Sequence, residues 1–174
     1  LVVVGILLYI SYAFRNTGKS AKNAGVSSWR MGVSAIIALV HDLVITVGFF
    51  VVLGKYRGVE VDSLFITALL TILGFSVHDT IVVFDRIREN LQKFPYKSLE
   101  TIIDYSTDST LARSINTSST LIIVLVSMLL FGGQSIFNFV LALLFGVTIG
   151  TYSSIFNASP ILYYWSKLGG AKQK

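Results

Sequence analysis

Two carboxylate side chains lie inside apolar stretches of this chain, and each follows a histidine. The first pair is His41-Asp42, near the middle of residues 31–53, and the second is His78-Asp79. A charged group at the centre of a membrane helix costs roughly 2.5–3.5 kcal/mol on insertion scales, so such groups are usually functional. Burial disfavours the charged form of a carboxyl group, which makes its neutral form accessible near neutral pH. A group that switches between the two forms suits proton transfer.

The two His-Asp pairs also admit a purely structural interpretation. Each histidine can hydrogen-bond a neighbouring helix, and Asp42 can hydrogen-bond across to its neighbour. A metal site is not expected, because neither dyad has histidines at i, i+4 spacing and the chain has no cysteine. The residues that follow Asp42 resemble those that follow Asp79, which gives a weak internal repeat. For Asp79 the favoured interpretation is a place in an ion path.

A polar stripe opens a later apolar stretch. Arg113, Thr117 and Thr120 share one helix face at i, i+4, i+7. The Arg113 guanidinium can extend inward as the counter-ion of a deprotonated carboxylate, or outward to lipid headgroups. The hydroxyl groups and Asn116 that follow it favour the inward position. The predicted ion path comprises Asp79, Arg113, Asp42, His78, His41, Thr117 and Thr120.

The elements that position these residues are predicted to be membrane helices. Of 174 residues, 53% are hydrophobic and 13% are charged, whereas an average soluble domain has roughly 25% charged residues. This composition, with a mean hydropathy of +0.73, excludes a soluble globular protein and a disordered tail. In hydrocarbon each span must be helical, so the expected fold is all-α, a polytopic transmembrane helix bundle. The five expected spans are residues 1–14, 31–53, 64–84, 115–131 and 136–165.

The first of these spans is incomplete. Residues 1–14 are too few to cross a bilayer, which takes roughly 20 residues. No charged segment precedes them and no small-residue cleavage site follows, so they are not expected to be a signal peptide. We expect them to continue a helix that begins earlier in a longer protein.

The basic residues predict the orientation of the bundle. Twelve of the 14 Lys and Arg residues lie in residues 15–30, in residues 85–114 and in the C-terminal tail. By the positive-inside rule these three segments are cytoplasmic. Their charges are then expected to meet the anionic headgroups of the lipid bilayer. Nucleic-acid binding is not expected, because the charges are spread over three segments instead of one folded face.

The long segment at residues 85–114 is expected to be a cytoplasmic loop with some helical structure. Its first residues continue the preceding helix into water, and Pro95 ends that helix. Leu99, Ile102 and Ile103 then have the i, i+3, i+4 spacing of an amphipathic helix at the membrane surface. The alternative is a solvated connector with one apolar side.

The last span has a seam of small residues, which predicts close helix packing. Near its end, Asn157 adds a polar point and Pro160 predicts a kink. We expect no enzyme, because the chain lacks a phosphate-binding glycine loop, a nucleophile with its base and a metal-ligand set. The seam residues, at i+4 spacing, are Ala142, Gly146, Gly150, Ser154 and Ala158.

Three motifs resemble one known family. Residues 75–90, FSVHDTIVVFDRIREN, closely resemble the signature of the bacterial SecF family of protein-export subunits. Residues 113–121, RSINTSSTL, with the later FGG at 131–133, are similar to the family's fifth-helix motif, and His41-Asp42 with residues 46–48 to its third-helix motif. One departure is His78, where the family more often has asparagine.

The resemblance implies a six-helix subunit of the RND-type membrane proteins, of which this chain would supply helices two to six. Its members pair with a SecD-like subunit and use the proton motive force to help preproteins through the SecYEG channel. Asp79 and Arg113 match the family's intramembrane Asp and Arg implicated in conduction of H⁺, or in some relatives Na⁺, and no other cofactor is implied. The implied location is the bacterial cytoplasmic (inner) membrane.

Two other functions fit the same residues. A non-conducting assembly subunit would use its polar residues only to hold helices together. An RND-type exporter of small hydrophobic molecules would need a large apolar pocket that opens to the lipid.

Overall fold

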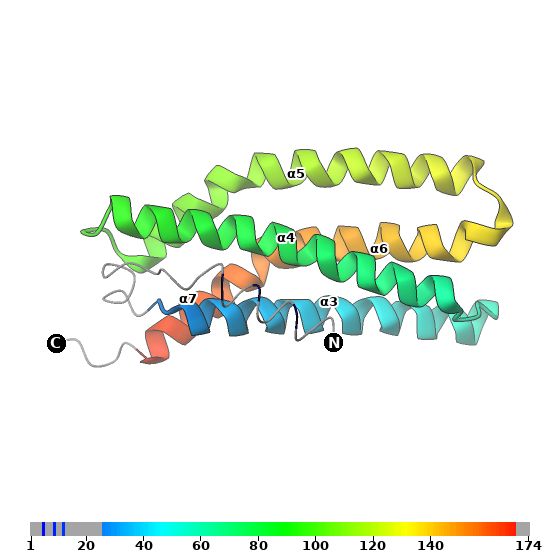
Figure 1. The fold of residues 1–174 in the computed structure, drawn as a ribbon, viewed down its shortest axis with the longest axis horizontal. Helices are drawn as coiled ribbons and strands as arrows, with labels where there is room; N and C mark the ends of the chain where they lie inside the picture. Colours follow the sequence, from blue (N-terminus) through cyan, green and yellow to red (C-terminus); the bar gives the residue numbers. More distant parts are fainter. Residues whose placement is uncertain (1–4, 6–8, 10–11, 13–25, 170–174) are drawn as a thin grey trace.

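The computed structural model describes residues 5, 9, 12 and 26–169. The described chain forms an elongated bundle of antiparallel helices (Figure 1). Four of its helical segments are long and apolar enough to cross a membrane, with α6 and α7 counted as one. The predicted all-α transmembrane bundle is therefore confirmed. The helices are α3 (Ser28–Arg57), α4 (Ser63–Lys93), α5 (Leu99–Phe131), α6 (Gln134–Phe156) and α7 (Ala158–Gly169).

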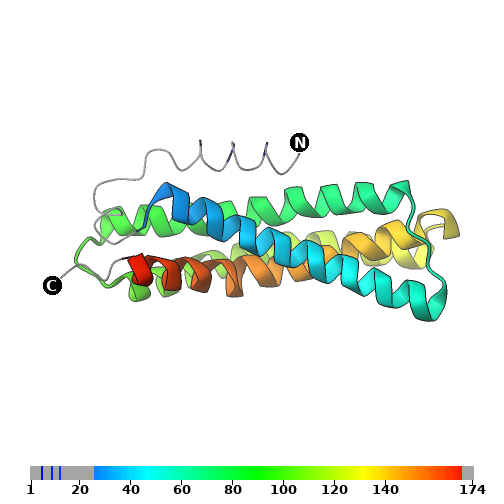
Figure 2. The same cartoon turned by 90° about the horizontal axis from the view of Figure 1, so that it is seen from below.

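Four of the five expected spans fall on these helices. Residues 31–53 lie within α3, 64–84 within α4 and 115–131 within α5, while 136–165 cover most of α6 and α7. The expected span at residues 1–14 lies outside the described residues, apart from positions 5, 9 and 12. Among the described elements, the α3–α4 and α5–α6 connections lie at one end of the bundle and the α4–α5 connection at the other (Figures 1 and 2).

Side-chain caps explain where three of the helices begin. The Asp62 carboxylate accepts a hydrogen bond from the backbone N–H of Phe65 at 2.9 Å at the start of α4. Ser98 does the same for Thr101 at 3.2 Å at the start of α5, and Ser27 caps α3. Each cap satisfies a backbone donor that has no partner within its helix. The three caps therefore fix the residue at which each of these helices begins.

The break between α6 and α7 falls at Asn157, which confirms the kink predicted there. Pro160 has no N–H, so the carbonyl of Phe156 cannot receive the helical bond from residue 160. The backbone of Asn157 departs from ideal helix geometry, with φ −108° and ψ −49°. Its N–H still donates to the Ser153 carbonyl at 2.9 Å. The final span therefore changes direction without losing all of its hydrogen bonds.

The prediction of a separate amphipathic helix at the membrane surface after Pro95 is wrong. α5 begins at Leu99 and continues to Phe131 as a single helix, because residues 99–131 contain no glycine or proline to end it. Ile102 and Ile103 are buried in a cluster that includes residues of α4 and α7. The apolar stripe thus packs against the protein's own helices instead of the lipid surface. The segment at 85–114 is mostly two helices joined at residues 94–98.

The core consists of two apolar clusters with polar residues between them. One cluster lies near the α4–α5 connection and includes Phe84 and Leu162. The other lies toward the opposite end and includes Phe50 and Ile72. Buried polar side chains occupy the intervening levels of α3 and α4, where apolar packing is interrupted. They are Asp42, Thr46, Ser76, Asp79 and Thr80.

The small residues of α6 allow it to pack closely on α4. A Cβ atom added at Gly146 would overlap the side chain of Ile72. At Gly150 an added Cβ would lie 3.2 Å from the Ser76 Cβ. Ser154 is fully buried, and its hydroxyl donates to the Thr151 carbonyl at 3.0 Å. The seam therefore sets how near α6 comes to the polar residues of α4.

Gly146→Ala is expected to destabilise the bundle by about 1–3 kcal/mol, because Ile72 must leave its present position. The measurement is thermal or denaturant unfolding of the purified full-length protein in detergent. Gly74→Ala is the matched control, since an added Cβ there meets no atom within 4 Å. Equal stability of the two variants would show that the α4–α6 contact is looser than described.

Candidate functional site

Asp42 is the centre of a hydrogen-bonded cluster between α3 and α4. Its side chain is buried, with 1% exposure. One carboxylate oxygen, Oδ2, accepts a hydrogen bond from the Ser76 hydroxyl at 2.5 Å. The other, Oδ1, lies 3.1 Å from Nδ1 of His41. Both oxygens of this carboxylate are therefore partnered inside the protein, which lowers the cost of its burial.

The same cluster extends to the break between α6 and α7. The side-chain amide of Asn157 lies 3.3 Å from Nε2 of His41. Ser76, Asp42, His41 and Asn157 thus connect α4, α3 and the α6–α7 junction through consecutive polar contacts. Gly150 borders this cluster, since a Cβ added there would lie 3.7 Å from Asp42 Oδ2. The cluster joins three segments at the level of the bundle where apolar packing is interrupted.

Ser76→Ala is expected to destabilise the protein by about 1–3 kcal/mol, because it leaves Asp42 Oδ2 buried without a donor. Denaturant unfolding of the full-length protein in detergent measures this change. Ser63→Ala, on the exposed first turn of the same helix, is the control. Should Ser76→Ala unfold like the control, the short Ser76–Asp42 bond would carry little of the stability.

Asp79 is buried between α4 and α5 and is only partly satisfied. Its side chain has 4% exposure, and its Oδ2 atom has no hydrogen-bond partner among the described residues. Its electrostatic neighbours are His78 on its own helix, and Arg113 and Ser114 on α5. The Ser114 hydroxyl is itself buried without a hydrogen bond. Buried polar atoms are usually paired, so the free oxygen of Asp79 is suited to bind a proton, a water molecule or a small cation.

The buried polar residues of α5 lie one position later in the sequence than the predicted stripe of Arg113 and Thr117. Ser114 and Ser118 are buried, whereas Thr117 and Thr120 are exposed. The hydroxyls of these two threonines donate to the carbonyls of Arg113 and Asn116, both at 2.9 Å. Arg113 and His78 are also exposed residues at the edge of the site. The structure therefore makes Arg113 an electrostatic neighbour of Asp79 but leaves Thr117 and Thr120 on the outer face.

Three polar residues of this region were missed by the reasoning from sequence. Ser76 lies one turn before Asp79 on α4, and Ser114 and Ser118 lie one turn apart on α5. The Ser118 hydroxyl pairs with that of Thr151 at 2.6 Å, which joins α5 to α6. The signal that could have found Ser114 and Ser118 is a series of small hydroxyl residues at i+4 spacing. That series is Ser106, Thr110, Ser114 and Ser118.

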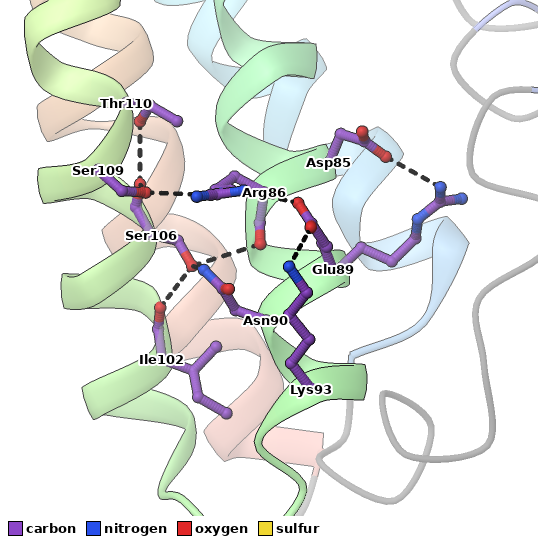
Figure 3. A network of polar contacts seen from close by, with 10 residues as sticks. Asp85, Arg86, Glu89, Asn90, Lys93, Ile102, Ser106, Ser109 and Thr110 are labelled. Carbon is purple, nitrogen blue, oxygen red and sulfur yellow. Dashed lines mark hydrogen bonds and ion pairs between the residues drawn. The ribbon is translucent and has the colours of Figure 1, made fainter.

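A polar network joins α4 and α5 near the connection between these two helices (Figure 3). Arg86 donates from Nε to the Ser109 hydroxyl at 3.2 Å and from Nη1 to Glu89 at 2.8 Å. Asn90 donates to the Ser106 hydroxyl at 2.8 Å. Arg86 therefore bridges the two helices and is held in place by a carboxylate of its own helix.

A cavity of about 310 Å³ lies beside this network. Arg86 and Glu89 line it near the α4–α5 connection, and Arg113 lines it nearer to Asp79. The cavity wall is partly polar, so it suits water better than an apolar molecule. No group of three or more His, Asp or Glu side chains in the described part of the chain is placed to hold a metal ion.

A bundle of four helical segments that are long and apolar enough to cross a membrane defines the class, the integral membrane proteins. Residues 1–168 match the family model described as protein export membrane protein SecD/SecF, C-terminal. The chain belongs to this family.

Individual relatives agree with the family assignment. The chain is 53% identical over 165 residues to a protein translocase subunit SecF of Thermobaculum terrenum, covering 95% of the chain and 50% of that protein. It is 44% identical to the SecF subunit of a Synechocystis species, with 95% and 48% covered. A crystal structure of SecDF in a super-membrane-facing form matches with a TM-score of 0.84 and 34% identity, over 98% of the chain and 21% of that structure's chain. The chain spans about half the length of these SecF relatives.

Proposed function

We propose that this chain is the membrane part of a subunit that uses an ion gradient to promote preprotein translocation through the SecYEG channel. The observation that carries the proposal is Asp79, which is buried between α4 and α5 with one unpartnered oxygen and with Arg113 as its charged neighbour. The relatives named protein translocase subunit SecF support the biological role. The proposed role is transport, with no covalent chemistry.

The proposed ion path runs from the cavity at Arg86 past Arg113 to Asp79. Protonating Asp79 removes its attraction to Arg113, so α4 and α5 can repack. One charge that crosses 100 mV supplies about 2.3 kcal/mol, so several ions are needed for each large movement. The coupling ion is H⁺, with Na⁺ as the alternative. Asp42 and His41 support the path by joining α3 to α4 and to the α6–α7 junction. His78 supports it as an electrostatic neighbour of Asp79.

Thr117 and Thr120 belong to the proposed path on the outer face of α5. With Arg113 they form a polar face that the described helices leave exposed. A SecD-like partner that packs on this face would remove it from lipid and complete the path. Each threonine hydroxyl already bonds a carbonyl of its own helix, so it can accept a further hydrogen bond from water or a partner.

The proposed location is the bacterial cytoplasmic membrane, with residues 15–30 and 85–114 and the C-terminus on the cytoplasmic side. The basic residues at the end of α4 support this orientation. The cavity at Arg86 then opens toward the cytoplasm. Asp79 would receive its ion from the opposite side and release it through this cavity.

The experiment that tests the function uses the full-length protein with its SecD-like partner and SecYEG in inverted membrane vesicles. Translocation of a preprotein is measured with an imposed gradient, and again after a protonophore or a sodium ionophore. We expect the complex to stimulate translocation only while one gradient is present. Stimulation that survives collapse of both gradients would contradict the proposal and favour a non-conducting assembly subunit.

A further inference from the structure

A groove outside the ion path lies between the first half of α5 and the α6–α7 junction. It has a volume of about 520 Å³. One wall carries Glu100, Asp104 and Asp108, which follow each other at i+4 spacing along α5. The other wall comes from α7 and includes Ser159 and Tyr163. We call this feature the acidic groove.

The charge of the acidic groove is not balanced within the described chain. Glu100, Asp104 and Asp108 form no ion pair with another described residue, although the Tyr163 hydroxyl donates to Glu100 at 3.3 Å. The acidic residues at the end of α4 differ, because Asp85 pairs with Arg88 and Glu89 with Arg86 and Lys93. Three carboxylates therefore lie along about 12 Å of helix without a cation partner among the described residues.

A second observation points to a ligand at the same place. Ser159 borders the groove with 2% exposure, and its hydroxyl has no hydrogen-bond partner among the described residues. The Thr107 hydroxyl across the groove is also buried and unpartnered. Because buried polar groups are usually paired, a polar group that reaches these two hydroxyls from the groove would satisfy them.

The apolar residues of the groove restrict the kind of ligand. Ile103 and Ile155 are buried residues that border it, and Tyr164 contributes an exposed ring. A ligand that satisfies this lining needs an apolar part beside its cationic groups. An amphipathic protein segment with lysine or arginine one helical turn apart has both, and its spacing matches that of the carboxylates.

We propose that the acidic groove binds a lysine- or arginine-bearing amphipathic segment of a partner membrane protein. The cations lie between the carboxylates of α5, and the apolar side packs against α7. An amine-bearing lipid is less suited, because its phosphate would meet the same three carboxylates. The groove is at the end that we propose to be cytoplasmic, where membrane proteins carry most of their basic residues. The inference thus rests on the proposed orientation but not on the ion path.

The test uses the full-length protein with its partner subunit in detergent and a defined probe. The probe is a fluorescein-labelled helical peptide of leucine and lysine, with lysines at i, i+4, and its binding is followed by fluorescence anisotropy. We expect Asp104→Asn with Asp108→Asn to weaken binding about tenfold, a loss of about 1.4 kcal/mol. Glu60→Gln with Asp62→Asn removes the same charge at the other end of the bundle and is expected to leave binding unchanged.

Equal binding of the lysine peptide to both double variants would overturn the proposal. It would show that the peptide responds only to the net charge of the protein and not to the acidic groove. Equal binding of a peptide with glutamate in place of lysine would overturn it too. So would displacement of the lysine peptide by phosphatidylethanolamine micelles but not by unlabelled peptide, which would assign the groove to lipid. Asp79→Asn is expected to bind the peptide normally, so failure of the ion path and failure of the groove give different results.

Discussion

Asp79→Asn is expected to abolish the whole gradient-dependent part of preprotein translocation by the intact complex. Asparagine nearly preserves the size of the side chain and its hydrogen bonds, but it cannot take up or release a proton or balance Arg113. Because Asp79 lies buried between α4 and α5, no solvent-exposed carboxylate can replace it. The measurement is translocation into inverted vesicles with an imposed gradient, compared with translocation without one.

Asp62→Asn is the matched control for this experiment. It makes the same chemical change on the same helix, and asparagine also caps a helix well, so the capping bond to Phe65 can persist. We expect the control to translocate like wild type. Gradient-dependent translocation that remains in Asp79→Asn would contradict the ion path, and it would favour an assembly subunit whose polar residues only join helices.

Arg113→Lys is expected to lose most of the gradient-dependent translocation, even though it keeps the positive charge. Arg113 lines the cavity and is also a charged neighbour of Asp79. Its planar guanidinium can bond several groups at once, while a lysine ammonium is a compact and strongly hydrated charge. The assay is the same translocation measurement, and Arg57→Lys at the end of α3 is the control. Wild-type activity of Arg113→Lys would show that the position needs only a charge.

The membrane fold could be predicted from composition and from the lengths of the apolar stretches. A helix is the only open structure in which every backbone N–H and C=O group is hydrogen-bonded in hydrocarbon. Each apolar stretch long enough to cross the membrane therefore predicts one helix. The break at Asn157 was predictable for an equally local reason, the missing N–H of Pro160. The continuity of α5 was missed because Leu99, Ile102 and Ile103 have the same spacing in a surface helix and in a buried one.

The candidate site could be predicted only in part. Asp42 and Asp79 were found because a carboxylate in an apolar stretch is rare. The buried face of α5 was not found, because serine and threonine can bond their own helix and so occur on either face. Thr117 and Thr120 do this on the outer face, while Ser114 lies inward beside Asp79. Only the packing of α5 against α4 and α6 decides between these faces.

The most direct measurement of the central claim is infrared difference spectroscopy of the intact complex during a pH jump. A carboxyl group that takes up a proton gains a carbonyl stretching band that shifts in D₂O. If Asp79 carries the ion, this band is present in wild type and in Asp62→Asn and is missing in Asp79→Asn. A band of the same size in Asp79→Asn would contradict the claim that Asp79 changes its protonation state.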